Sequence, residues 1–344
     1  IPRYLYDTLT PDVLARQIEQ RWVARRLAMG QRIVIDTRLL RYMDPERVQH
    51  HWIDFWTGQY KKKLEHSDTL AIGMFNWPRA VIESLTSLLV GQEPQPYQLN
   101  VMPWRGDDIA SSVQAELVEQ FVQRWQNSPY EGVYDELLND RAANIYALGR
   151  NVNYIWPEAD AALPKARNIW PGSVATFWQS DMRTLECAIL ATEMLPGEAA
   201  AMYPEKEKEI YAATHKGSSY FSLVGRERAE LSWDINSVVT VLACWYRTSK
   251  NTIGHAAVLS QAAADTRMRS ARTVLLEQHK DTLALDIPLK VVPRFRTNDR
   301  PPDEAHGVLY DIAPVVTMHA EVVSAAYDML KRAIYQRYVL SNAY

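Results

Sequence analysis

The sequence contains little cysteine and no excess of either charge. Cys187 and Cys244 are the only cysteines among 344 residues. Two isolated cysteines do not make a disulfide framework or a cysteine-rich zinc site, and they fit a reducing compartment. Lysine and arginine number 38 against 41 aspartates and glutamates, which gives a net charge of −3. This balance lacks the basic footprint of a protein that grips a phosphate backbone, although DNA could still pass nearby.

Motifs of nucleotide enzymes and of membrane proteins are also missing. The 13 glycines are scattered, and none lies in a phosphate-cradling G-x-x-x-x-G-K-[ST] or a dinucleotide-binding G-x-G-x-x-G pattern. There is no G-x-S-x-G nucleophile elbow. We therefore expect no enzyme, no cofactor and no catalytic residue. No apolar run approaches the roughly 18 residues of a membrane helix, so we also expect no membrane partner.

One small group of possible metal ligands lies in a predicted helix. His50 and His51 precede Asp54 by four and three residues, and His66 follows. Metal sites use such spacings, so one alternative is a metal-dependent hydrolase built on His50, Asp54 and His66. A surface or interface pair is the simpler interpretation, since the remaining histidines form no cluster in the sequence. We therefore predict no metal site.

The residues that are present are sufficient for a large core. Hydrophobic residues make up 47% of the chain and aromatic residues 10%, which excludes global disorder. Helical periodicity predicts helices near 11–29, 44–63, 77–90, 109–125, 202–213, 261–278 and 315–340. Strand patterns predict strands near 152–156, 166–170, 184–191, 238–246 and 285–295, the last confined by its prolines to a sheet edge or to irregular pairing. We expect an α+β fold that is mainly helical.

The chain is organised around residues 134–190. A helical pattern ends at Gly149, where a helix commonly stops in a left-handed turn. An alternating strand, a polar turn, a second strand and a corner at Pro171 follow. The sequence therefore predicts a helix that leads into a small antiparallel meander.

Three features of the chain, taken in order, resemble the portal proteins of tailed bacteriophages. The first is the helix, strand, turn, strand and corner just described, with Ala142, Ala143, Leu148, Gly149, Pro171, Val174 and Asp181. The second is a capped helix that ends in glycine and proline, with Asn76, Pro78, Val81, Leu88, Leu89, Val90, Gly91 and Pro94. The third is an aromatic strand followed by an Ile-Pro strand, a loop and a long helix, with Trp245, Tyr246, Ile287, Pro288, Leu289, Phe295, Asp299 and Asp311.

The resemblance implies a wing, stem and clip arrangement and a ring of copies, usually a dodecamer, at one capsid vertex. Such a ring passes double-stranded DNA and binds the terminase large subunit, the major capsid and scaffolding proteins, and later a head-tail adaptor protein. It resides in the virion, and in the host cytoplasm before assembly. We expect helices and a wing-like α+β region in 1–220, a mixed strand and helix region in 221–306, and a long helix with a truncated C-terminus in 307–344. Another oligomeric minor capsid protein is the remaining alternative.

The last predicted helix has two distinct faces. Val315, Met318, Val322, Ala326 and Met329 share an apolar face that is suited to packing within or between subunits. Glu321, Asp328 and Lys331 belong to the polar side, which would meet water and could face the channel of a ring.

Overall fold

The computed structural model describes residues 9–42, 77–90, 101–103, 109–126, 135–156, 164–213, 215–216, 237–249, 252–260, 273–283, 286–295 and 301–316, with 318–319, 322, 325–326 and 329–330 further along. The chain forms two compact units, and each is built from two separate stretches. Unit 1 comprises Ile1–Val34 and Asn151–Glu304, and unit 2 comprises Ile35–Arg150 and Ala305–Tyr344. The three consecutive regions expected from the sequence stay a prediction.

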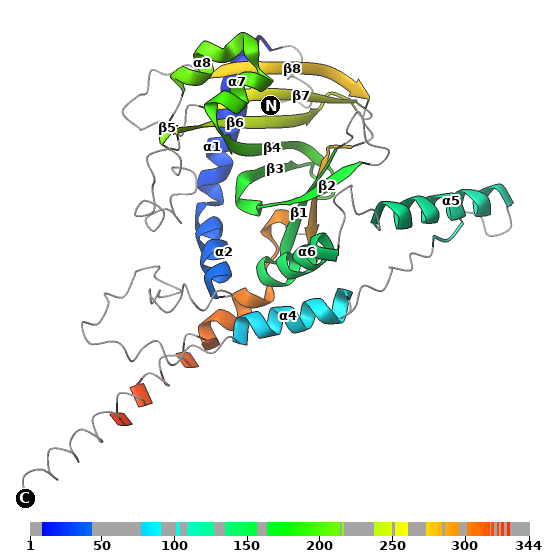
Figure 1. The fold of residues 1–344 in the computed structure, drawn as a ribbon, viewed down its shortest axis with the longest axis vertical. Coiled ribbons are helices and arrows are strands. Elements are labelled where there is room, and N and C mark those ends of the chain that lie inside the picture. Colours follow the sequence, from blue (N-terminus) through cyan, green and yellow to red (C-terminus); the bar gives the residue numbers. More distant parts are fainter. Residues whose placement is uncertain are drawn as a thin grey trace, which may run out of the picture. The chain divides into compact units, whose positions relative to one another are not determined.

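The centre of unit 1 is a large antiparallel sheet (Figure 1). Its order is β3-β4-β6-β7-β8, and every neighbouring pair is antiparallel. The strands are β3 (Val174–Trp178), β4 (Leu185–Met194), β6 (Ser237–Arg247), β7 (Thr252–Ser260) and β8 (Val274–Leu283). The short strand β5 (His215–Lys216) pairs with the start of β6.

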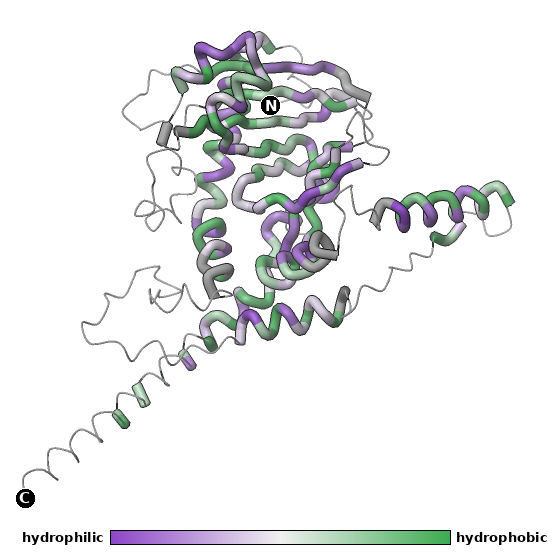
Figure 2. The backbone as a smooth tube through the Cα atoms, in the orientation of Figure 1, coloured by the Kyte–Doolittle hydropathy of each residue, from purple (hydrophilic) through white to green (hydrophobic). Residues whose placement is uncertain are grey.

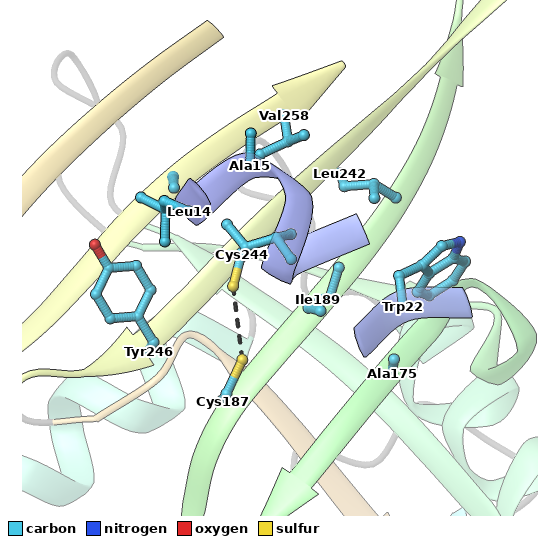
Figure 3. Packing of buried hydrophobic residues seen from close by; sticks show 12 residues of the cluster. Leu14, Ala15, Trp22, Ala175, Cys187, Ile189, Leu242, Cys244, Tyr246 and Val258 are labelled. Atoms are coloured by element: carbon cyan, nitrogen blue, oxygen red, sulfur yellow. Dashed lines mark hydrogen bonds between the residues drawn. The ribbon is translucent and has the colours of Figure 1, made fainter. Parts of the chain in front are cut away.

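Helix α1 (Pro11–Ala28) covers one face of this sheet (Figure 3). Its buried side chains are Leu14, Ala15, Ile18 and Trp22, which recur every three or four residues and so form one stripe. In β4, Cys187 and Ile189 point into this layer, whereas Ala188 and Leu190 belong to the opposite layer. This alternation is the period of two that a strand buried on both faces must have.

The opposite face of the large sheet carries two further groups of elements. One is a three-stranded sheet of order β2-β1-β9, with β1 (Arg150–Trp156) and β2 (Lys165–Ile169) antiparallel and β9 (Leu289–Pro293) on the other side of β1. The other group contains α7 (Pro196–Met202), η4 (Pro204–Lys206) and α8 (Glu207–Ala212), whose Ala199 and Ile210 pack with Val239 and Leu259. The short turn η3 (Pro171–Ser173) leads into β3, and η5 (Pro302–Glu304) closes the unit.

Unit 2 is built from helices. Helix α2 (Gly30–Tyr42) follows α1 after Met29 and carries the chain from one unit into the other. Then come α4 (Trp77–Val90), α5 (Ile109–Gln126) and α6 (Asp135–Leu148), of which α4 and α6 pack together. Every described residue between 308 and 330 is helical, and we call this segment the C-terminal helix. No described helix has the length and apolarity to cross a membrane.

Two glycines of unit 2 allow backbones to cross closely. Gly149, just after α6, has a φ of +84°, and a Cβ added there would lie 2.2 Å from the carbonyl carbon of His306. A Cβ added to Gly307 would lie 2.2 Å from the carbonyl oxygen of Ala147. The segment 305–307 therefore lies directly against the end of α6, and only glycine fits at both positions. The predicted left-handed stop at Gly149 is confirmed.

The expectation of a mainly helical chain is wrong, because two antiparallel sheets form much of unit 1. The sequence pattern missed β3, which has only five residues, and β7, which is buried on both faces and so has no clear alternation. It also extended a helix to residue 278, where β8 begins at Val274. The expected single meander is split, because β1 and β2 pair in one sheet and β3 and β4 in the other. The edge position of the proline-flanked strand β9 is confirmed.

Candidate functional site: two exposed helix faces

The described residues contain no metal centre. His50, Asp54 and His66 lie outside them, so the hydrolase alternative has no geometry to be judged by. Within the part of the chain that the structure describes, no group of three or more histidine, cysteine, aspartate or glutamate residues could hold a metal ion.

A buried carboxylate in unit 1 serves the fold. Asp303 in η5 accepts a hydrogen bond from the Thr176 hydroxyl at 2.7 Å and from the Trp178 indole at 3.1 Å. The guanidinium of Arg25 on α1 forms an ion pair with the Asp303 carboxylate, with an N–O distance of 2.6 Å. Both carboxylate oxygens are thus occupied by partners from α1 and β3. The arrangement joins the first and last segments of unit 1 and leaves no oxygen directed at a substrate.

A second buried ion pair lies in unit 2. Arg150 donates to Asp36 at 2.6 Å, and the two side chains are only 2% and 1% exposed. Removing one partner of such a pair leaves a buried charge uncompensated, which typically costs about 3–5 kcal/mol. This pair fixes α2 beside the residue that follows Gly149, so its role is structural.

An aromatic row crosses the opposite face of the large sheet. Trp245, His255 and His279 are direct cross-strand neighbours on β6, β7 and β8, and their ring centroids lie 5.2 and 6.2 Å apart. Burial lowers the pKa of His255, an effect that Glu277 opposes and His279 reinforces. His255 is therefore neutral at pH 7 and acts as a packing residue.

The two cysteines are free residues of the core. Their sulfur atoms lie 3.6 Å apart beneath α1, and both side chains are fully buried (Figure 3). Burial raises the pKa of the Cys244 thiol, and the hydrogen bond with Cys187 raises it further. A neutral, inaccessible thiol is a poor nucleophile and a poor metal ligand.

The apolar face predicted for subunit packing is open to solvent in the single chain. Val315, Met318, Val322 and Met329 are 60%, 61%, 62% and 73% exposed, and Ala326 is exposed as well. The neighbouring Leu330 is 62% exposed. Packing against other described residues is thus not seen at these positions, and the contact within or between subunits expected for this face stays a prediction. Glu321, Asp328 and Lys331 lie outside the described residues.

Helix α5 has a second uncovered apolar face. Ile109 is 83% exposed, Val113 50%, Leu117 59% and Phe121 48%. The covered side of the helix carries small or polar residues instead: Ala115 is buried, and Glu119 accepts a hydrogen bond from the backbone of Val101 at 3.2 Å. Figure 2 shows the hydrophobic and hydrophilic stretches alternating along α5. The larger apolar groups therefore lie on the side that this chain leaves open.

No model of a known protein family matches the chain, and a search among curated proteins finds no relative. We therefore infer function from the sequence features and from the geometry of the described residues.

Sequence patterns located these two faces but not their exposure. In α5, apolar residues recur every four positions from Ile109 to Phe121, and such a stripe normally indicates a helix face that packs against the core. The opposite side of the helix distinguishes a buried stripe from an exposed one. Ala115 and Ser111 on that side are too small to form a core layer of their own. Val118 and Leu330, at the margins of the two faces, were missed.

Proposed function

We propose that this protein is a portal protein of a tailed bacteriophage. It would form the ring at one capsid vertex through which double-stranded DNA is packaged and ejected. The observation that carries the proposal is the order of the three portal-like features along one chain, the first of which falls on α6, Gly149, β1, β2 and the corner at η3.

Two further observations support the proposal. The sequence has no phosphate-cradling loop, as suits a conduit that leaves nucleotide hydrolysis to another protein. Two uncovered apolar helix faces on one chain suit a subunit that meets neighbours on two sides. A portal's partners would be further copies of this chain, transiting DNA, the terminase large subunit, major capsid and scaffolding proteins, and a head-tail adaptor protein.

The decisive experiment is the mass and image of the purified full chain. We expect a closed ring of copies, usually twelve in portal proteins, with an axial hole in negative-stain micrographs. Light scattering that gives the mass of one chain at micromolar concentration, with no ring in the images, contradicts the proposal. Turnover of ATP by the pure protein that a point mutation in this chain abolishes also contradicts it, because a portal leaves nucleotide hydrolysis to the terminase. A non-ring assembly favours the minor capsid alternative.

A further inference from the structure

Helix α5 presents an apolar ridge that the described residues of its own chain leave uncovered. Ile109, Val113, Leu117 and Phe121 follow one another at steps of four residues, and Val118 flanks them. Their exposed fractions range from 48% to 83%. Together they expose on the order of several hundred Å² of apolar surface, which is the size of the largest patch on a typical monomer and often marks an interface.

The C-terminal helix presents a seam of matching length. Val315, Met318, Val322 and Met329 are separated by three, four and seven residues, which is the spacing of positions that face one partner helix. From Val315 to Met329 the seam runs about 21 Å, and from Ile109 to Phe121 the ridge runs about 18 Å, at 1.5 Å per residue. Ridges at four-residue steps pack into grooves at three-residue steps when two helices cross at about 20°.

The two faces differ in sequence and shape, and this difference determines what kind of assembly they can build. A face that pairs with its own copy gives a two-fold dimer and then has no free surface left. A closed ring needs two different faces on each copy, one that meets the preceding subunit and one that meets the following subunit. Because the chain carries two unlike apolar faces, each uncovered, it meets this requirement.

We infer that the ridge of α5 on one copy packs into the seam of the C-terminal helix on the next copy. The occupant of each face is thus the other face of a second identical chain. The inference rests on the proposed ring and adds which surfaces close it. Buried from both sides, the pair approaches the lower end of the roughly 1,200–2,000 Å² of stable interfaces, and ring closure repeats the contact at every subunit.

Cysteine crosslinking between two single variants tests the pairing. One chain carries Val113→Cys and the other Val322→Cys, the two are co-expressed, and the assembly is mildly oxidised. Native Cys187 and Cys244 are 0% exposed and do not compete. We expect a disulfide-linked dimer that contains one chain of each kind, and at least tenfold less product from either variant alone. As a matched control, Ser111→Cys lies on the same side of the helix as the buried Ala115, and with Val322→Cys it should give little product.

Every outcome decides the inference. A homodimer linked through Val113→Cys alone means that α5 pairs with its own copy, and it overturns the inference. A ring of unchanged mass without the mixed crosslink also overturns it while the proposed portal function stands. A monomeric wild-type chain overturns both. Circular dichroism shows whether each variant folds, which both should do because the substituted positions are exposed.

Discussion

At the scale of single residues, the tightest constraint is the crossing of two backbones beside α6. The left-handed φ of Gly149 and the 2.2 Å approach to His306 act at the same position. A side chain there would face a strained backbone and an immovable carbonyl group together.

Gly149→Ala should therefore destabilise unit 2 by about 1–3 kcal/mol or more, since both strain and overpacking cost energy. The matched control is Gly30→Ala at the start of α2, where an added Cβ meets no atom within 4 Å. That substitution should be neutral or stabilise by about 0.4–1 kcal/mol, because alanine restricts the unfolded chain and suits a helix. Urea-unfolding midpoints of the two variants measure the difference, and equal midpoints would refute the crossing.

The buried histidine gives a prediction about pH. Burial lowers the pKa of His255 below its usual 6.5, with His279 acting in the same direction and Glu277 against it. The unfolded chain therefore binds more protons than the folded chain between the two pKa values. Stability is fully present above pH 6.5 and is lost as the pH falls through the folded pKa.

The measurement is the urea midpoint at pH 7.5 and at pH 5.5. Wild type should lose more stability between these pH values than His255→Gln, in which the titrating group is gone. Carboxylates change both proteins alike, so the difference between the two slopes isolates His255. Equal slopes would mean that this imidazole titrates as it does in the unfolded chain.

At the scale of elements, the exposure of the seam in the single chain means that a charged substitution there should affect assembly rather than the stability of the single chain. Val322 is 62% exposed in the single chain. Val322→Asp therefore leaves a carboxylate in water as long as the chain is alone, but buries it unpaired when two copies meet. Burial of a lone carboxylate costs several kcal/mol or forces its protonation.

We expect Val322→Asp to keep the melting temperature of the isolated chain and to abolish the ring on a sizing column. Asp328 belongs to the side that the sequence predicts to be polar, and Asp328→Asn should leave the ring intact, because a charge exposed to water contributes little to stability. Should Val322→Asp elute as a ring while Asp328→Asn dissociates, the two faces have been assigned the wrong way round.

The elements also show how far sequence patterns reach. Helix α5 and strand β6 were predicted nearly to the residue, because α5 has a clear helical period and β6 is a run of β-branched and aromatic residues. Helix α1 begins at Pro11, close to the predicted residue, but the hydroxyl of Thr10 before it makes no capping hydrogen bond. Strands such as β7 were missed because a strand buried on both faces has no alternation to detect. Pairing across two hundred residues, as between Arg25 and Asp303, leaves no local trace at all.

At the scale of the whole molecule, the two units are interleaved. Unit 1 takes its first helix from the start of the chain and its sheets from residues 151–304, and unit 2 supplies what lies between. The candidate faces both belong to unit 2, on α5 and on the C-terminal helix. Both candidate faces thus belong to the unit that does not contain the large sheet, so the strand pattern carried no information about them.

The division of unit 1 between two stretches of sequence also determines when α1 can pack against its sheet during synthesis. Helix α1 leaves the ribosome early. Its stripe of Leu14, Ile18 and Trp22 can be buried only after β6 and β7 have been synthesised, and these strands end at Arg247 and Ser260. At about 5–20 residues per second, that interval is on the order of ten seconds or more. During this interval the apolar stripe of α1 is exposed on the nascent chain. The N-terminal segment must therefore be protected from aggregation until β6 and β7 have been synthesised.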